Sequence, residues 1–418
     1  MQHFLLRQVN QIKQGGVSAL YRKLNKIKPH LINFPLYISA IPLVALIRII
    51  RPLVLIRWYA IVATRIGHFA ANIELYACEK DHNINVPAQR HFDIFFVGHK
   101  PICNYQLFIM WKRVLRIWPH YFMYPVMIIN KLIPGGECHE IKTSNHDRDV
   151  HNLFDKSSVH ISFSDQEEIY GASELRKHGI PEGAKFVCLI VRDSAYLEEL
   201  PYHSYRDGNI QQYVMACEEL ANRGYYVIRM GAKVKNSINS KHPKIIDYAT
   251  SGSRSEFMDI YLGAKCSFCI STSTGFDSIP AIFRKPIAFV TVPFSYIYTF
   301  SSKYISITKH HISKDDGREL SFSEICSMKL DVSLSSSDYH KKNIELVENS
   351  PEEIRDLVIE MADRLEGVWI EPTDDIKNRE RFKYIFSRCQ LSNKRHLHGE
   401  FYSHIGALFL KQNSHLLK

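Results

Sequence analysis

Small hydroxyl side chains and a glycine follow a short apolar run in the second half of the chain. The run Cys266–Ile270 predicts a strand buried on both faces of a parallel sheet. The residues after it are Ser271, Thr272, Ser273, Thr274 and Gly275, and a segment that can start a helix begins at Phe276. Free N–H groups, hydroxyls and a positive helix end suit an anion. We therefore predict that this loop binds a diphosphate, such as that of a nucleotide sugar; the alternative is a simple connector.

Charged residues follow the other predicted strands of this region, at Lys185–Val191, Tyr225–Arg229 and Lys244–Asp247. In a doubly wound sheet, the residues after each strand surround one crevice. The candidates there for donor and phosphate binding are Arg192, Asp193, Tyr205, Arg206, Arg229, Gly231, Asp247 and Tyr248. Guanidinium groups match phosphate, although each arginine could instead form a structural pair with an aspartate. Tyr248 or Phe276 could stack on a base or pack in the core.

Strands and helices alternate along most of the chain, which predicts an α/β fold. In the first half, strands are expected at Leu53–Val62 and Phe92–Val97, and helices at Phe69–Lys80 and Tyr105–Leu115. A chain of 418 residues is too long for one ordinary core, so two domains are expected. The predicted divisions are an N-terminal segment at 1–50, an α/β domain at 51–180, a second at 181–350, and C-terminal helices at 351–418 that pack back across the domains.

The net charge of +10 is concentrated at the N-terminus. Residues 1–72 contain ten Lys or Arg and no Asp or Glu, and they include the apolar run Leu31–Ile50. This combination predicts a helix on an anionic membrane surface. The alternative is a helical hairpin packed on the protein; nucleic acid is disfavoured because no binding module is present. Nine cysteines without a framework predict a reducing compartment, with Cys266 and Cys269 as core residues on opposite faces of a strand.

Several motifs together resemble an incompletely characterised bacterial glycosyltransferase family associated with surface polysaccharide and lipopolysaccharide assembly. They are V-R-D-x-x-Y (191–196), H-S-Y-R-D-G-N-I-x-x-Y (203–213), G-Y-Y-V-I-R-M-G (224–231), I-I-D-Y-A (245–249), S-E-F-M-D-I-Y-L (255–262), R-I-G-H (65–68) with Asn72, Glu74 and Leu75, and F-L-K-Q-N-S-H-L-L (409–417). The resemblance covers most of residues 53–417. The family pattern has a Ser-Gly pair in the central loop where this chain has Ser273-Thr274-Gly275, so the hydroxyl that would contact phosphate stays open.

The resemblance implies a GT-B-like fold, in which two Rossmann-like domains face each other across a cleft, and transfer of a sugar from a nucleotide sugar to a lipid-linked or lipopolysaccharide acceptor. The first domain would hold the acceptor, with Arg65, Gly67 and Asn72 on that side. His68 or Glu74 would take the proton of the acceptor hydroxyl. The alternative is an N-capping His68 and a solvated Glu74.

We expect no catalytic metal, because no D-x-D motif lies in a suitable loop, and no cofactor apart from the nucleotide-sugar substrate. Arginines and a helix dipole would meet the charge of the leaving group. A cytoplasmic protein, peripheral on the inner membrane, is expected. Two other functions fit the same features: a nucleotide-sugar epimerase of the same fold, and a non-catalytic, membrane-attached glycan-binding scaffold.

Overall fold

The structure is a computed structural model, and it describes residue 16 and residues 34–98, 101–144, 148–195, 201–389 and 400–418. Almost all of the predicted basic segment before residue 34 therefore lies outside the described residues. The contacts divide the chain into two compact units. The smaller unit comprises the described residues up to Ile61 together with Pro87–Gly98 and Leu115–Ile141. The larger unit comprises Val62–Val86, His99–Val114 and Lys142–Lys418.

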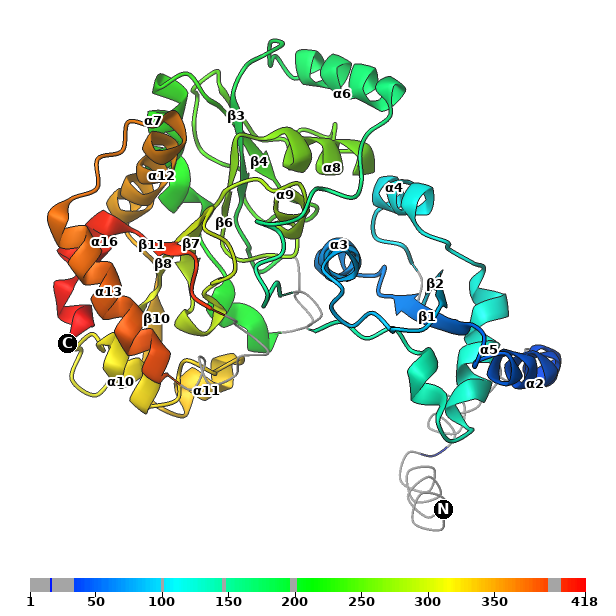
Figure 1. The fold of residues 1–418 in the computed structure, drawn as a ribbon. Helices are drawn as coiled ribbons and strands as arrows, with labels where there is room; N and C mark the ends of the chain where they lie inside the picture. The colour runs from blue at the N-terminus through cyan, green and yellow to red at the C-terminus, as the bar shows by residue number, and fades with distance from the viewer. Residues whose placement is uncertain (1–15, 17–33, 99–100, 145–147, 196–200, 390–399) are drawn as a thin grey trace. The chain divides into compact units, whose positions relative to one another are not determined.

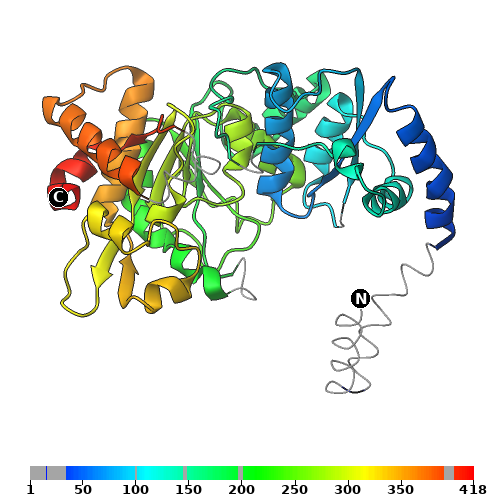
Figure 2. The ribbon, with the colours of Figure 1, turned by 60° about the horizontal axis from the view of Figure 1, so that its bottom comes forward.

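The smaller unit contains two parallel strands and two helices. Its elements are α2 (Phe34–Ile49), β1 (Leu55–Ile61), β2 (His91–Val97), α5 (His120–Lys131) and the 3-10 turn η1 (Gly136–His139). Strands β1 and β2 pair in parallel, and single parallel bridges extend the pair, from Trp58 to Glu140 and from Phe95 to Ile117. Helices α2 and α5 lie side by side (Figures 1 and 2).

The larger unit is built on a seven-stranded sheet in the order β11-β8-β7-β6-β3-β4-β5, in which every pairing is parallel. The strands are β3 (Phe186–Ile190), β4 (Tyr226–Met230), β5 (Ile245–Ile246), β6 (Phe268–Ser271), β7 (Ile287–Val292), β8 (Tyr304–Thr308) and β11 (His404–Ile405). A separate antiparallel pair joins β9 (His310–Ser313) and β10 (Ile344–Val347).

The helices of the larger unit include two that precede the sheet in the chain, α3 (Ile66–Asp81) and α4 (Tyr105–Val114). The others are α6 (Asp165–Lys177), α7 (Val214–Asn222), α8 (Glu256–Lys265), α9 (Ser278–Ile282), α10 (Phe322–Ser327), α11 (Ser336–His340), α12 (Pro351–Glu366), α13 (Thr373–Arg388) and α16 (Ala407–Gln412). Short 3-10 turns are η2 (Pro201–Arg206), η3 (Ile210–Tyr213), η4 (Phe294–Tyr296) and η5 (Ser414–Leu417).

Successive side chains of the strands enter two separate cores, because side chains alternate across a strand. Leu189 and Val227 pack with Leu220 of α7 and Leu357 of α12 on one face. The residues that pack with α8 on the other face are Cys188, Ile190, Ile228, Met230, Met258 and Leu262. Helices therefore cover both faces of the sheet (Figure 1), which confirms the predicted α/β class and the doubly wound sheet.

Several predicted features differ from the structure. The compact units do not follow the predicted limits at 50, 180 and 350, because α3 packs against α9 of the larger unit. Cys266 ends α8 instead of lying in the strand, and it shares one core with Cys269. Cys326 and Cys389 form a disulfide that the sequence analysis does not predict. No helix among the described residues is both long and apolar enough to cross a membrane.

Candidate functional site

The first strand of the large sheet, β3, lies between β4 and β6. The chain passes from β3 to β4 and β5 on one side, and then returns to place β6, β7 and β8 on the other side. The loops that follow β3 and β6 must therefore diverge at the carboxyl ends of these two strands, which is called a topological switch point. Ligands of open α/β sheets bind at such a point. The Arg192 N–H donates to Thr272 Oγ1 at 2.9 Å, which ties the two loops together.

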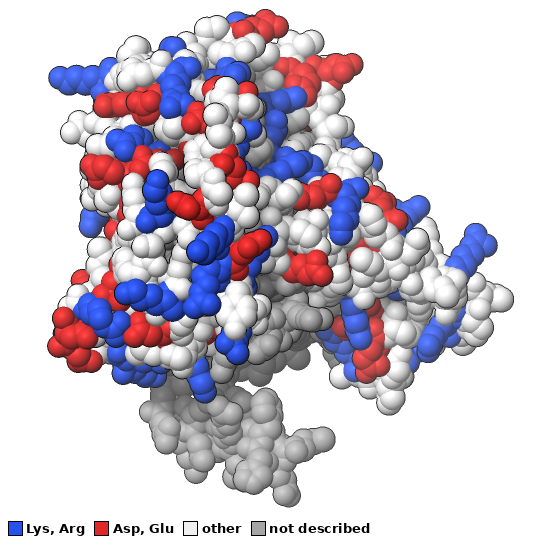
Figure 3. All heavy atoms as spheres, turned by 60° about the vertical axis from the view of Figure 1, so that its left-hand side comes forward, with Lys and Arg blue, Asp and Glu red and all other residues white. Residues whose placement is uncertain are grey.

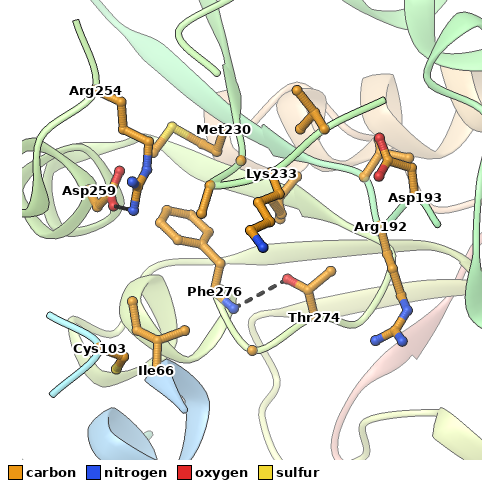
Figure 4. A pocket seen from close by; sticks show the side chains of 16 residues that line it. Ile66, Cys103, Arg192, Asp193, Met230, Lys233, Arg254, Asp259, Thr274 and Phe276 are labelled. Carbon is orange, nitrogen blue, oxygen red and sulfur yellow. Dashed lines mark hydrogen bonds and ion pairs between the residues drawn. The ribbon is translucent and has the colours of Figure 1, made fainter. Parts of the chain in front are cut away.

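A cavity of about 150 Å³ lies at this switch point. We call it the switch-point pocket. Its lining residues are Ile66, Cys103, Ile190, Val191, Arg192, Asp193, Met230, Gly231, Ala232, Lys233, Val234, Arg254, Asp259, Thr274, Gly275 and Phe276 (Figure 4). Six of these were predicted at the donor site: Arg192, Asp193, Gly231, Thr274, Gly275 and Phe276. The structure thus brings the ends of β3, β4 and β6 around one space.

Positive and apolar groups face this pocket together. Lys233 is exposed, and its ammonium group points toward the loop that carries Thr274, beside the Phe276 ring (Figure 4). Arg254 donates to Asp259 at 2.5 Å on the other side of that ring. Burial raises the pKa of Asp259 to about 6, against the lowering effect of Arg254. An aromatic face between two cations suits a nucleotide base attached to phosphates.

The hydroxyl loop after β6 is closed mainly by its own aspartate. Asp277 accepts from Ser271 Oγ at 2.9 Å and from the Thr274 N–H at 2.7 Å. Ser271 Oγ accepts the Ser273 N–H at 3.0 Å, and Ser273 adopts a left-handed φ of 63°. The helix predicted from Phe276 is only α9, which has five residues. The predicted cradle of free N–H groups is thus corrected: Ser271 and Ser273 are buried and hold the loop, while Thr274 and Gly275 reach the pocket.

The N-terminus of α3 approaches the same loop. A Cβ atom on Gly67 would lie 3.1 Å from Gly275 Cα, so only glycine allows this contact without displacement. Ile66 lines the switch-point pocket, and Arg65 is the exposed N-cap residue of the helix. His68 follows in the first turn and is partly exposed, whereas Asn72 is buried in the helix.

A second cavity, of about 410 Å³, opens on the face of the sheet that carries α7. We call it the polar pocket. Its lining residues are Val191, Asp193, Ser194, Ser204, Asp207, Gly208, Asn209, Ile210, Arg229, Lys235, Asn236, Lys309, Leu346 and Glu348. Arg229 is fully buried there and donates to both oxygens of Asp247 at 3.2 Å. Arg229 and Asp247 were predicted to bind donor phosphate. Because side chains alternate along β4, Arg229 lines the polar pocket, whereas Met230 lines the switch-point pocket. Nε and Nη2 of Arg229 have no hydrogen-bond partner among the described residues.

Three cations near the two pockets are held by groups of the protein. Arg192 Nε donates to Asp207 at 3.2 Å, and burial, followed by Arg206, lowers the pKa of Arg192. Lys309 donates to the Asp207 carbonyl at 2.7 Å, and burial lowers its pKa. Arg206 donates to the Ser273 carbonyl and lies 4.1 Å from the centre of the Tyr296 ring. Arg206 therefore supports the loop after β6 and lines neither pocket.

Two predicted aromatic ligand contacts are core residues. Tyr205 packs against Tyr296 and Tyr339, and its burial raises the pKa of its hydroxyl. Tyr248 is 1% exposed, accepts the Ser255 N–H at 2.8 Å and packs in the core on the α8 face. Since neither lines a pocket, stacking of Tyr248 on a base is corrected to core packing.

Glu74 belongs to a buried cluster apart from both pockets. Its carboxylate is 0% exposed, pairs with Arg284 at 2.5 Å and accepts from His160 at 3.0 Å. Hydrogen bonds with Cys78 and then Glu74 raise the pKa of His160 to about 10. The predicted solvated or catalytic Glu74 is corrected to a structural ion pair, because it holds two cations. Glu74, Cys78 and His160 lie close enough for a metal ion, but Arg284 also contacts this cluster.

Lys233, Arg254 and Asp259 were missed by the sequence analysis. The segment after β4 was considered only as far as Gly231, although Lys233 lies two residues further in the same loop. Arg254 lies just before the motif S-E-F-M-D at the start of α8, and Asp259 is the last residue of that motif. A count of charges near helix N-termini could therefore have found both residues.

No family model matches the sequence, and no curated protein matches it. The solved structures that are similar to the chain include two from bacteria. ADP-heptose lps heptosyltransferase II of E. coli is 13% identical, covers 60% of this chain and 90% of its own, and has a TM-score of 0.38. The glycosyl transferase family 9 protein of Veillonella parvula DSM 2008 is 11% identical, covers 75% of this chain and 96% of its own, and has a TM-score of 0.43. Both TM-scores are below 0.5.

Proposed function

We propose that the chain is a glycosyltransferase whose switch-point pocket binds the nucleotide diphosphate of a sugar donor. One observation carries this proposal: the cavity lies where β3 and β6 diverge, and Lys233, Arg254 and the Phe276 ring surround it. The cations match the phosphates and the ring matches a base. Glycosyl transfer itself is what the sequence resemblance implies. The acceptor is a lipid-linked or lipopolysaccharide glycan, and the protein works at the cytoplasmic face of the inner membrane.

In this reaction the acceptor hydroxyl attacks the anomeric carbon, the bond to the diphosphate breaks, and the nucleoside diphosphate leaves. Lys233 and Arg254 stabilise the charge that develops on the leaving phosphate. His68 takes the proton of the acceptor hydroxyl, a role that the sequence resemblance implies; it is partly exposed in the first turn of α3. His68→Gln should lower kcat about 10²-fold or more while nucleotide affinity stays constant.

The binding step is tested by thermal unfolding of the full chain with a panel of nucleoside diphosphates. A ligand at a hundred times its Kd should stabilise the protein by ~2.7 kcal/mol. Lys233→Ala should weaken that ligand about tenfold, because a hydrogen bond to a charged group contributes ~1.5 kcal/mol. Lys235→Ala is the matched control, since Lys235 is an exposed lysine two residues away that lines only the polar pocket. Equal affinity in both variants would contradict the proposal.

The reaction type is tested with a radiolabelled donor. A transferase consumes the donor only when an acceptor glycan is present. Conversion of the free nucleotide sugar to its epimer would support an epimerase instead, and glycan binding without turnover would support a scaffold. Activity that survives EDTA would support the absence of a catalytic metal.

A further inference from the structure

Helix α2 exposes a row of large apolar side chains. Phe34, Ile38, Ile41, Leu46 and Ile49 are between 52% and 74% exposed. Hydrophobic residues therefore cover nearly the whole helix, including the side that faces away from the protein. A helix that is apolar all round is normally buried in a protein core or in a membrane.

The inner side of α2 is fixed to the smaller unit. Ala40, Val44 and Ile47 are buried, and they pack in one cluster with Trp58, Ile94, Phe96, Met123 and Val126. These three positions are spaced over two helical turns, so α2 is held from its middle to its C-terminal end. Because this face is already used, the helix is placed to lie along a bilayer surface instead of crossing it.

More apolar side chains gather at the C-terminal end of α2. Arg48 donates to the Asn130 side chain and to the carbonyls of Ile133 and Pro134, so it clamps this end against the end of α5. Next to the clamp, Leu53 and Leu132 are 79% and 74% exposed. The clamp thus fixes the C-terminal end of α2 against the end of α5. We call the exposed residues Phe34, Ile38, Ile41, Leu46 and Ile49 of α2 the apolar face.

Charge identifies what covers this face. Residues 1–61, 87–98 and 115–141 contain twelve Lys or Arg and three Asp or Glu. On a surface of the chain drawn in Figure 3, by contrast, positive and negative side chains are interspersed. An isologous contact with a second copy would bring two positive units together, which is unfavourable. An anionic phospholipid bilayer offers an apolar interior for the exposed side chains of α2 and a negative surface for the basic residues of this unit.

We infer that the apolar face of α2 docks on an anionic phospholipid bilayer, with α2 lying in the plane of the interface. This inference does not depend on the proposed reaction. Its chemistry is the insertion of apolar side chains below the headgroups, together with attraction of exposed basic residues of the same unit, such as Arg51, to lipid phosphates.

The test is flotation of the full chain with vesicles of phosphatidylglycerol and phosphatidylethanolamine, compared with vesicles of phosphatidylcholine alone. The wild type should float with the anionic vesicles. The double variant Ile38→Glu and Ile41→Glu should lose at least about tenfold in affinity, because two charges replace two inserting side chains. The matched control is Ile169→Glu with Ile370→Glu, since these isoleucines are 70% and 85% exposed on the larger unit.

The flotation results decide the inference once the two double variants are shown to be comparable in fold. Equal thermal unfolding and equal nucleotide affinity of the two double variants would show that only the surface has changed. Binding of both variants like the wild type would overturn the inference, as would a wild type that floats with no vesicle. A wild-type dimer that the Ile38 and Ile41 changes convert to a monomer, with unchanged flotation, would assign the face to a second copy and would also overturn it.

Discussion

The switch-point pocket and the polar pocket share Val191 and Asp193 at the end of β3, but they lie on opposite faces of one sheet. In the switch-point pocket, Lys233 is exposed beside an aromatic ring, without an ion-pair partner among the described residues. In the polar pocket, Lys235 is also exposed, but Arg229 and Lys309 are buried and held by groups of the protein. A cation that is already neutralised inside the fold contributes stability, whereas an exposed one is available for a ligand. This difference gives four predictions.

The largest expected effect is on stability and concerns the polar pocket. Arg229→Ala leaves Asp247 without its partner and should lower the free energy of unfolding by about 3 kcal/mol, since a broken buried pair leaves an uncompensated charge. Denaturant unfolding measures this loss. Affinity for nucleoside diphosphate should stay within about twofold. The double variant Arg229→Leu with Asp247→Leu should recover most of the stability. A tenfold loss of nucleotide affinity would return Arg229 to the donor site.

The second prediction concerns pH and the switch-point pocket. Burial raises the pKa of Asp259 from 3.8 to about 6, so the folded protein holds a proton that the unfolded chain has lost between these values. This contribution to stability is therefore largest below pH 4 and falls as the pH rises to 6. Protonation also removes one negative charge beside Arg254. Affinity for a nucleotide sugar should rise on the order of tenfold as the pH falls through 6.

The bridging phosphates of a nucleotide sugar do not titrate in this range, so the ligand itself adds no pH dependence. Asp259→Asn is the control variant: its affinity should be high and nearly independent of pH. Calorimetric titration at several pH values measures both proteins. A wild-type affinity that is flat across this range would contradict the assignment of Asp259 to the pocket wall.

The third prediction concerns the hydrogen bond that ties the loops after β3 and β6. Thr272→Val removes the hydroxyl that accepts the Arg192 N–H, and it should cost about 1–2 kcal/mol of stability. Nucleotide affinity should fall about threefold, since both loops line the switch-point pocket. Ser306→Ala is the control, because this buried hydroxyl has no hydrogen-bond partner in the described part of the chain. Unchanged affinity in Thr272→Val would show that the tie does not shape the pocket.

The smallest expected effect tests the corrected role of Tyr248. Tyr248→Phe loses the hydroxyl that accepts the Ser255 N–H and should cost about 1 kcal/mol of stability. Affinity for every nucleotide of the panel should stay the same, because the ring packs in the core. A selective loss of affinity for one base would restore Tyr248 to the binding site.

The order of strands and helices in the larger unit could be predicted from the sequence because it depends on local patterns. Apolar runs such as Lys185–Val191 have short-range causes, and the structure confirms this run as β3. The same logic placed Thr274 and Gly275 after a strand, at the carboxyl edge where they line the pocket. Residues near the end of a strand can thus be assigned to the carboxyl edge of the sheet from the sequence alone.

Only the tertiary structure decided on which face of the sheet a side chain lies and which partner it contacts. Arg229 and Met230 are neighbours in the sequence but point into different pockets, because a one-residue step reverses the direction of a strand side chain. Glu74 meets Arg284 across 210 residues, a pairing that no local pattern encodes. Local propensities determined the elements; long-range packing determined which charges are neutralised and which face the solvent.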